Sequence, residues 1–262
     1  MAVLPLGLDA RRRPACGLAA SGAPLGDRRG PLGDGAAVVS DSSPPTPDPA
    51  RFEVAIPPPP HPFEPLIEVL PAGSRLFRSF SAAPDRHATT FNPGYGGPHR
   101  FSFFGDPTIA VLYAAQTEIA AVCESLLHDV PLFGGRLMPE QYERTVVAAL
   151  DTTRELRLAA FHGVGLRRLG VEPAQLTSSP ASTYGTTVAW GEAAHAAGFD
   201  GVVWMSARCN TDRAYVLFGD RVHGDDLRVV PDYGRVFTTG PDRDWLVDLC
   251  AFMKVDVLTR AP

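Results

Sequence analysis

The sequence predicts a mixed α+β domain that follows a leader of different composition. Strand-like runs of β-branched and aromatic residues outnumber helical patterns over residues 64–262, and the two patterns do not alternate as in a repeated βαβ fold. Residues 1–65 hold 14 of the 26 prolines and only two of the aromatic residues. We therefore expect one folded domain over residues 64–262 and a disordered leader rich in proline, glycine and arginine over residues 1–63.

The leader ends in a proline run that favours an extended conformation. Four prolines at 57–60, followed by His61 and Pro62, are typical of a stiff polyproline II segment. Such a segment can be a ligand for a proline-recognition domain, but a solvated linker is the simpler interpretation. Residues 1–50 show no sustained period of 2 or 3.6, so no regular structure is predicted for them.

Strands dominate the first half of the predicted domain. Short runs at residues 76–80, 101–103 and 109–113 have the composition of strands, and the dense Gly and Pro residues at 91–98 predict a loop. Thr117 can cap a following helix, which is expected to continue to about His128.

The second half of the domain is predicted to hold further strands and three helical segments. A short helical piece should end at Gly170, a longer helix should open at Ser182 or Thr183 and end before Gly198, and Asp242 should cap the last helix. The apolar stripe of that last helix is interpreted as core packing. The strands are expected at residues 145–150, 155–160, 201–205, 214–218 and 227–230, and the stripe consists of Trp245, Leu246, Leu249, Cys250 and Met253.

Charge and hydropathy exclude several classes of protein. The formal net charge is −5, which argues against direct binding of nucleic acid or of an anionic membrane surface. No stretch approaches 18 consecutive apolar residues, so no transmembrane helix is predicted. The first residues lack a basic segment ahead of an apolar run, and the leader contains acidic residues, so neither a secretory signal nor a transit peptide is expected. We therefore expect a cytoplasmic protein.

Cysteine and histidine spacing predicts neither a disulfide framework nor a metal site. The four cysteines, Cys16, Cys123, Cys209 and Cys250, lie far apart and are expected to be reduced thiols. The seven histidines form no HxH or HExxH motif, so no metal ion or bound cofactor is predicted.

Glu124 is the most informative carboxylate in the sequence. On the predicted helix it shares a face with Ala120, Ala121 and Leu127, and it follows Tyr113 at a strand end by eleven residues. A carboxylate among small apolar residues points into the protein or into a pocket, where it needs a partner or a catalytic task. The alternative is a glutamate at the helix edge that pairs with an arginine for solubility.

Ser206 follows a buried-strand candidate at residues 201–205, and Arg208 follows it closely. Small polar residues at the end of a buried strand often line a ligand site. An ordinary transition from strand to loop is the alternative. No GxSxG motif surrounds Ser206, so the sequence does not predict a nucleophile elbow.

Arg78 and Arg100 are each flanked by aromatic residues at a predicted strand. This setting favours an oriented guanidinium group, which suits a phosphate or a carboxylate. The chain contains only one lysine, Lys254, among its 24 basic residues, as a high-GC genome would produce. Arginine content alone therefore says nothing about phosphate binding, and a surface salt bridge remains the alternative for each residue.

The order of these segments resembles the RES domain, a family named for its arginine, glutamate and serine. The chain reads Leu-Phe-Arg at 76–78, Val-Leu-Tyr-Ala-Ala at 111–115, Gly-Phe-Asp-Gly-Val-Val-Trp-Met-Ser-Ala-Arg at 198–208 and Val-Leu-Phe at 216–218. The LYxA…E and GxDGxxxxSAR patterns are the most specific parts. The resemblance spans about residues 66–220.

The resemblance implies roles for five residues of this chain. Glu124 would supply negative charge to the reacting ribose, and Arg78 would hold a pyrophosphate. Tyr113 would stack on the nicotinamide ring, and Ser206 would hydrogen-bond the nicotinamide riboside region. Arg78, Tyr113, Glu124 and Ser206 are thus the implied catalytic set, and Arg100 joins Arg78, Tyr113 and Ser206 as an implied NAD⁺ contact.

RES proteins are known as bacterial toxins that degrade NAD⁺ and are paired with Xre-type antitoxins. Their fold is similar to that of ADP-ribosyltransferase toxins, which implies a mainly antiparallel sheet with flanking helices. NAD⁺ would be the substrate rather than a cofactor, and an antitoxin would be the partner, with a higher-order complex as a further expectation. Water as acceptor gives a glycohydrolase, phosphate gives a phosphorylase and a protein side chain gives an ADP-ribosyltransferase. A catalytically inactive RES-like binding module is the alternative from a different class.

Overall fold

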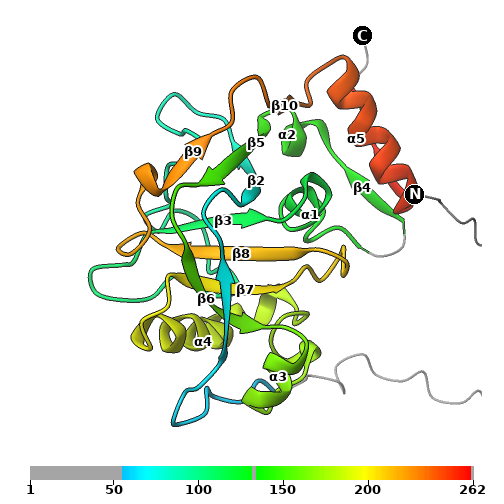
Figure 1. The fold of residues 1–262 in the computed structure, drawn as a ribbon. Helices are drawn as coiled ribbons and strands as arrows, with labels where there is room; N and C mark the ends of the chain where they lie inside the picture. The colour runs from blue at the N-terminus through cyan, green and yellow to red at the C-terminus, as the bar shows by residue number, and fades with distance from the viewer. Residues whose placement is uncertain (1–54, 132–133, 261–262) are drawn as a thin grey trace, which may run out of the picture. The chain divides into compact units, whose positions relative to one another are not determined.

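A computed structural model describes residues 55–131 and 134–260 of the chain (Figure 1). Most of the predicted leader and Cys16 lie outside the described residues. The strands are β1 (Leu66–Leu70), β2 (Arg75–Ser81), β3 (Val111–Ala115), β4 (Gly135–Leu137), β5 (Thr145–Thr152), β6 (Leu156–Phe161), β7 (Gly201–Met205), β8 (Arg213–Phe218), β9 (Leu227–Val229), β10 (Arg235–Val236) and β11 (Val255–Val257). The helices are α1 (Glu118–Cys123), α2 (Pro139–Tyr142), α3 (Val164–Leu169), α4 (Tyr184–Ala196) and α5 (Pro241–Phe252).

One nine-stranded sheet organises the described residues. Its strands follow the order β1, β6, β7, β8, β3, β2, β5 and β10, and β9 also pairs with β5. Within this sheet β6 and β7 are parallel, and the other described pairs are antiparallel. Strands β4 and β11 form a separate parallel pair. This mixed, mainly antiparallel sheet with flanking helices confirms the predicted α+β class.

Alternating side chains on the central strands build two cores, one on each face of the sheet. On β7, Val202 and Trp204 belong to one core and Val203 belongs to the other. Helices α3 and α4 pack against β6 and β7, and their buried residues, including Trp190, join the first core. Figure 1 shows these two helices at one end of the view, away from α1 and α5.

Most predicted elements are confirmed. The strands expected at 76–80, 145–150, 155–160, 201–205, 214–218 and 227–230 are present within a few residues, and the strand expected at 109–113 begins at Val111. Helix α3 ends at Gly170 in a left-handed conformation, and Gly198 has a positive φ of 88° just after α4, as the terminating glycines predicted. On α5, Leu246, Leu249 and Cys250 are buried in the core.

Three expectations about local structure are wrong. Residues 101–103 are not a strand, because the backbones of His99 and Ser102 bond to each other and close a tight turn. The apolar residue in this pattern, Phe101, is explained by its ring, which is buried against Phe161 and Trp204. The last helix begins at Pro241, and Asp242 accepts a hydrogen bond from the Val236 amide instead of capping it. The helix after Thr117 is also shorter than expected.

That shorter helix, α1, begins as predicted and ends early. The Thr117 side chain accepts a hydrogen bond from the Ala120 amide, so it is the N-cap. The helix ends at Cys123 because the Leu127 amide bonds back to Val122, which breaks the regular pattern. Glu124 is therefore the C-cap residue of α1 rather than an interior helical residue.

The proline run contacts the domain. The Trp190 indole N–H donates to the Pro57 carbonyl at 2.9 Å, and the Phe63 ring packs edge-on against Phe161 and Trp190. The Gln175 side chain also donates to the Ala55 carbonyl. Contacts with the folded domain thus begin earlier in the chain than residue 64.

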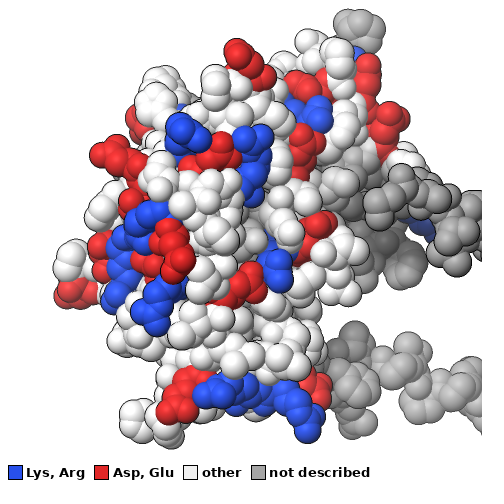
Figure 2. Space-filling model, viewed as in Figure 1, with Lys and Arg blue, Asp and Glu red and all other residues white. Residues whose placement is uncertain are grey.

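The surface of the described residues carries charges of both signs. Figure 2 shows acidic and basic side chains interspersed on the face in view. A polyanion would therefore meet carboxylates beside arginines on this face. In the described part of the chain, no helix is long and apolar enough to cross a membrane. Cys123, Cys209 and Cys250 are free thiols.

Candidate active site

The candidate site lies where strands β2 and β3 separate. The two strands pair only at Phe77 and Ala115, although a continuous antiparallel register would also pair the residues beyond Phe77 with residues 111–114. Beyond that point β2 continues to pair with β5, whereas β3 pairs with β8. The sheet thus opens, and a cavity of about 810 Å³ is lined by residues of both strands.

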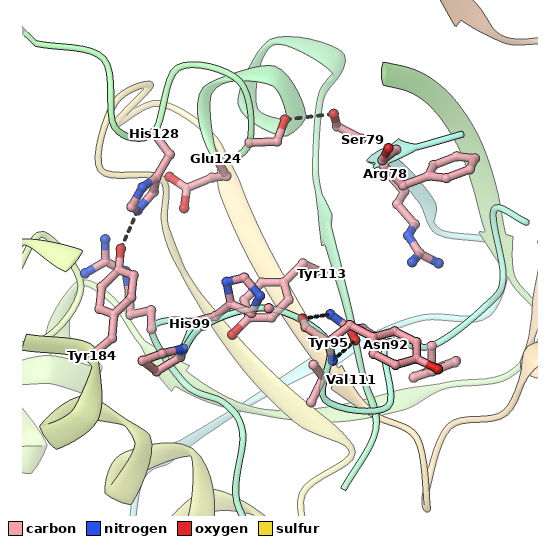
Figure 3. Close-up of a pocket in the computed structure, with 18 of the residues that line it drawn as sticks. Arg78, Ser79, Asn92, Tyr95, His99, Val111, Tyr113, Glu124, His128 and Tyr184 are labelled. Carbon is pink, nitrogen blue, oxygen red and sulfur yellow. Dashed lines mark hydrogen bonds between the residues drawn. The ribbon is translucent and has the colours of Figure 1, made fainter. Parts of the chain in front are cut away.

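The cavity brings together side chains from distant parts of the sequence (Figure 3). In this view, Glu124, His128 and Tyr184 lie on one side, and Arg78, Asn92 and Tyr95 lie on the other. His99 and Tyr113 lie between these groups. The volume is within the usual range for small-molecule sites.

Glu124 is held at the cavity wall by the segment that follows β7. Its Oε1 accepts hydrogen bonds from Ser206 Oγ at 2.7 Å and from the Ala207 amide at 3.0 Å. Within the described part of the chain, no hydrogen bond reaches Oε2. One carboxylate oxygen is therefore fixed, and the other can interact with a bound molecule.

Ser206 lies behind Glu124. Its side chain is fully buried, and its Oγ also accepts a hydrogen bond from the Cys209 amide. Ser206 is absent from the cavity wall, so it acts on the cavity through Glu124. The sequence singled out the residue, but its place beneath the carboxylate depends on the turn that follows β7.

Arg78 extends from β2 into the opposite side of the cavity (Figure 3). Its Nη1 donates to the Ala88 carbonyl at 2.7 Å, and its guanidinium lies 5.4 Å from the centre of the Phe80 ring. Burial, and to a lesser extent the neighbouring Arg86, lowers the pKa of Arg78 to about 10. Arg78 is therefore still a cation at neutral pH, and it is held in one orientation.

Tyr113 is fixed through its hydroxyl group. That oxygen lies 3.0 Å from Ser102 Oγ and accepts a hydrogen bond from the Phe101 amide. Burial raises the pKa of Tyr113 to about 12, so the phenol stays neutral. The ring packs edge-on against His99 and Trp204. Tyr113 thus anchors the turn at residues 99–102 and lines the cavity with its ring.

Arg100 is used mainly to hold the wall of the cavity together. It is almost fully buried, and its Nη1 donates to the carbonyls of Leu176 and Ser179. Its guanidinium also lies 4.9 Å from the centre of the Tyr184 ring. Of the two arginines singled out from the sequence, Arg78 projects from β2 into the cavity and makes one hydrogen bond to a carbonyl, and Arg100 is largely committed to hydrogen bonds within the protein.

Comparison with known proteins places the chain in a family. Residues 75–239 match the family model of the RES domain, which is more than half of the chain. The chain belongs to the RES domain family. No curated protein matches it. Among solved structures, a chain from the crystal structure of the M. tuberculosis MbcT–MbcA toxin–antitoxin complex is similar, with 16% sequence identity and a TM-score of 0.45. That similarity covers 63% of this chain and 85% of the other chain.

The RES match contains all the residues singled out from the sequence, and it also contains cavity residues that sequence reasoning missed. His128 follows Glu124 by four residues; its Nδ1 lies 2.7 Å from Asp129 Oδ1 and its Nε2 is hydrogen-bonded to Tyr184. The His128 carbonyl accepts two hydrogen bonds from Arg208. No sequence signal linked Tyr184 to His128, which lies 56 residues away.

His99 is a further lining residue of this RES domain that the sequence did not single out. Burial, and then the proximity of His128, lowers the pKa of His99, so its imidazole is neutral at neutral pH. Elsewhere, the described residues contain no group of three His, Cys, Asp or Glu side chains arranged to hold a metal ion.

Proposed function

We propose that this RES protein consumes NAD⁺ by cleaving the bond between nicotinamide and ribose, and that it is the toxin of a toxin–antitoxin pair. One observation carries the proposal. A carboxylate with one oxygen fixed, Glu124, lies across a cavity of about 810 Å³ from an oriented guanidinium, Arg78. NAD⁺ carries a cationic nicotinamide riboside and an anionic pyrophosphate, so this separation of charges fits the molecule. Resemblance to RES toxins supports the same conclusion.

The proposed reaction needs a negative charge near the ribose. The carbon–nitrogen bond breaks, its electron pair leaves with neutral nicotinamide, and positive charge develops on the ribose as in an oxocarbenium ion. The free Oε2 of Glu124 would stabilise that charge, and it could accept a proton from an attacking water. Because Ser206 and Ala207 already hold Oε1, the carboxylate needs no reorganisation during the reaction.

Arg78 and Tyr113 would position the substrate. The remaining N–H groups of Arg78 would bind the pyrophosphate in a bidentate manner, as a lysine could not. The Tyr113 ring would contact the nicotinamide, and Ser206 would contribute through Glu124. In this proposal NAD⁺ is the substrate, and no cofactor takes part.

The first test is incubation of the purified full-length protein with NAD⁺. We expect Glu124→Gln to lower turnover at least 100-fold, because it removes a preorganised charge worth about 3 kcal/mol in the transition state. Glu192→Gln is the matched control: Glu192 is exposed on α4 and does not line the cavity. The proposal is contradicted if the wild-type protein leaves NAD⁺ intact both without and with added phosphate. Equal turnover by Glu124→Gln and the wild-type protein would also contradict it.

Mass spectrometry of the products identifies the acceptor. Water gives ADP-ribose, inorganic phosphate gives ADP-ribose 1″-phosphate, and transfer to a protein adds an ADP-ribosyl group to a side chain. Each reaction also releases nicotinamide. We expect one of the first two products, because the proposed substrate is consumed without a protein target.

An enzyme that depletes NAD⁺ must be restrained in the cell that makes it. We therefore expect an antitoxin, of the Xre type or another type, that covers the cavity mouth. Growth should stop when the protein is expressed alone, and Glu124→Gln should restore growth. Co-expression with the product of the neighbouring gene should also restore growth and yield a complex on purification. Normal growth with the wild-type protein at full expression would contradict a toxin role.

A further inference from the structure

The loop on the Arg78 side of the cavity holds an aromatic ring in an exposed position. Tyr95 is 64% exposed, although it lines the cavity. The Asn92 side chain fixes its backbone: Oδ1 accepts from the amides of Gly94 and Tyr95, and Nδ2 donates to the Tyr95 carbonyl. Asn92 itself forms two backbone hydrogen bonds with Val111 at the start of β3. The loop is thus attached to the sheet, and Tyr95 is displayed from a fixed backbone.

The other aromatic side chains of the cavity are less accessible to a ligand that would stack on them. Tyr184 is buried, its ring is close to Arg100, and its hydroxyl is bonded to His128. The Phe80 ring lies near the Arg78 guanidinium. Among the aromatic residues that line the cavity in the described part of the chain, the others are buried or half-buried and Tyr95 alone is exposed. A water-exposed ring on a fixed loop is suited to stacking against a planar ligand.

Two arginines lie in the same part of the cavity. The Arg86 guanidinium lies 5.9 Å from the centre of the Tyr95 ring, and Arg78 is held by Ala88, two residues after Arg86. Both arginines line the cavity, and Asp85 on the same loop only partly offsets their charge. Two cations beside an exposed ring match a purine attached to a diphosphate.

We propose that Tyr95 and Arg86 form the subsite for the adenosine diphosphate part of the substrate. The adenine ring stacks on Tyr95, and the diphosphate lies between Arg86 and Arg78. This inference rests on the proposed function, because it assigns one half of NAD⁺ to this side of the cavity and leaves the nicotinamide riboside near Glu124. It adds residues that recognise the adenosine diphosphate half to a site for which the RES resemblance implied Arg78 as the pyrophosphate ligand and assigned no residue to the adenine.

Calorimetric titration of the full-length protein with ADP tests the subsite without any turnover. We expect Tyr95→Ala to weaken ADP binding about 10-fold or more, since stacking of one base on an aromatic ring contributes on that scale. Tyr95→Phe keeps the ring and should bind ADP within about twofold of the wild-type protein. Arg86→Ala should also weaken ADP binding. Because Tyr95 and Arg86 are exposed, these variants should keep the wild-type melting temperature.

Nicotinamide mononucleotide, which lacks the adenylate half, is the matched ligand. Its affinity should be the same for the wild-type protein and Tyr95→Ala. No ADP binding by the wild-type protein, or equal ADP binding by Tyr95→Ala, would overturn the subsite. If NAD⁺ is consumed with the same KM by Tyr95→Ala, the subsite is wrong and the proposed function stands. If Tyr95→Ala weakens ADP binding but the wild-type protein leaves NAD⁺ intact, the subsite stands and the proposed function is wrong.

Discussion

The position of one serine hydroxyl explains how the carboxylate at the cavity wall is held in one orientation. Ser206 Oγ donates to Glu124 Oε1 and accepts from the Cys209 amide, so it connects the C-cap of α1 to the turn after β7. The Ala207 amide makes the second hydrogen bond to the same oxygen. In the proposed reaction Ser206 is therefore a positioning residue, and its effect on turnover should depend on Glu124.

A double-mutant cycle tests that dependence. We expect Ser206→Ala to lower kcat about 10-fold, because Glu124 loses one of its two hydrogen bonds, and to leave KM nearly unchanged. In a Glu124→Gln background, Ser206→Ala should cause little further loss. Ser178→Ala, at an exposed position outside the cavity, is the control. Independent, additive losses from Ser206→Ala and Glu124→Gln would show that Ser206 does not act through the carboxylate.

Residue types and local spacing were enough to single out Glu124, Arg78 and Ser206, but they did not give their contacts. The position of Ser206 at a predicted strand end indicated a residue that lines a ligand site, but the direction of its side chain depends on the turn at 206–212, where the Ser206 amide donates to the Asp212 carbonyl. Tyr95 had no sequence signal beyond the glycine-rich loop, because its place at the cavity depends on a backbone that the Asn92 side chain holds by hydrogen bonds.

At the scale of elements, β2 connects the site to the sheet through its pairing with β5. Arg75 and Asp151 lie directly opposite each other on these strands and form a bidentate ion pair, with distances of 2.8 and 3.1 Å. The hydrogen bonds from Arg75 hold the pKa of Asp151 below its ordinary value. Strands such as these could be predicted because each is a short run rich in β-branched and aromatic residues. The separation of β2 from β3 could not be predicted, because it depends on β2 pairing with β5 and β3 pairing with β8 beyond Phe77 and Ala115.

The Arg75–Asp151 pair predicts a pH-dependent contribution to stability. Because the pKa of Asp151 is lower in the folded state, the stabilisation is fully present above the unfolded-state pKa and is lost as the pH falls through the folded-state pKa. Asp151→Asn should therefore unfold at a lower urea concentration than the wild-type protein at pH 7, and the difference should close as the pH falls through the lowered folded-state pKa of Asp151. Asp248→Asn, at an exposed site on α5, is the control variant. A difference that stays constant with pH would contradict this assignment.

At the scale of the whole molecule, the proline run completes the core on the α3 and α4 side of the sheet. The Pro57 carbonyl accepts the N–H of Trp190, whose side chain is 1% exposed, and Phe63 packs against the same indole. Composition predicted a boundary near residue 64, because a run of prolines has no period that would indicate a packed element. The contacts that join residues 55–63 to the domain come from backbone carbonyls and one aromatic ring, and a count of residue types cannot detect them.

Chains that begin at residue 55 and at residue 64 should therefore differ in stability. Loss of residues 55–63 leaves the Trp190 N–H without its carbonyl partner and exposes the surface that Phe63 covers, so we expect a loss of about 2–5 kcal/mol in the free energy of unfolding. Urea titrations of the two chains measure this difference. In a Trp190→Phe background no N–H needs a partner, so the same deletion should cost about 1 kcal/mol less. Equal unfolding midpoints for the 55–262 and 64–262 chains would show that the proline run lies on the domain without stabilising it, and that the stable unit begins near Glu64.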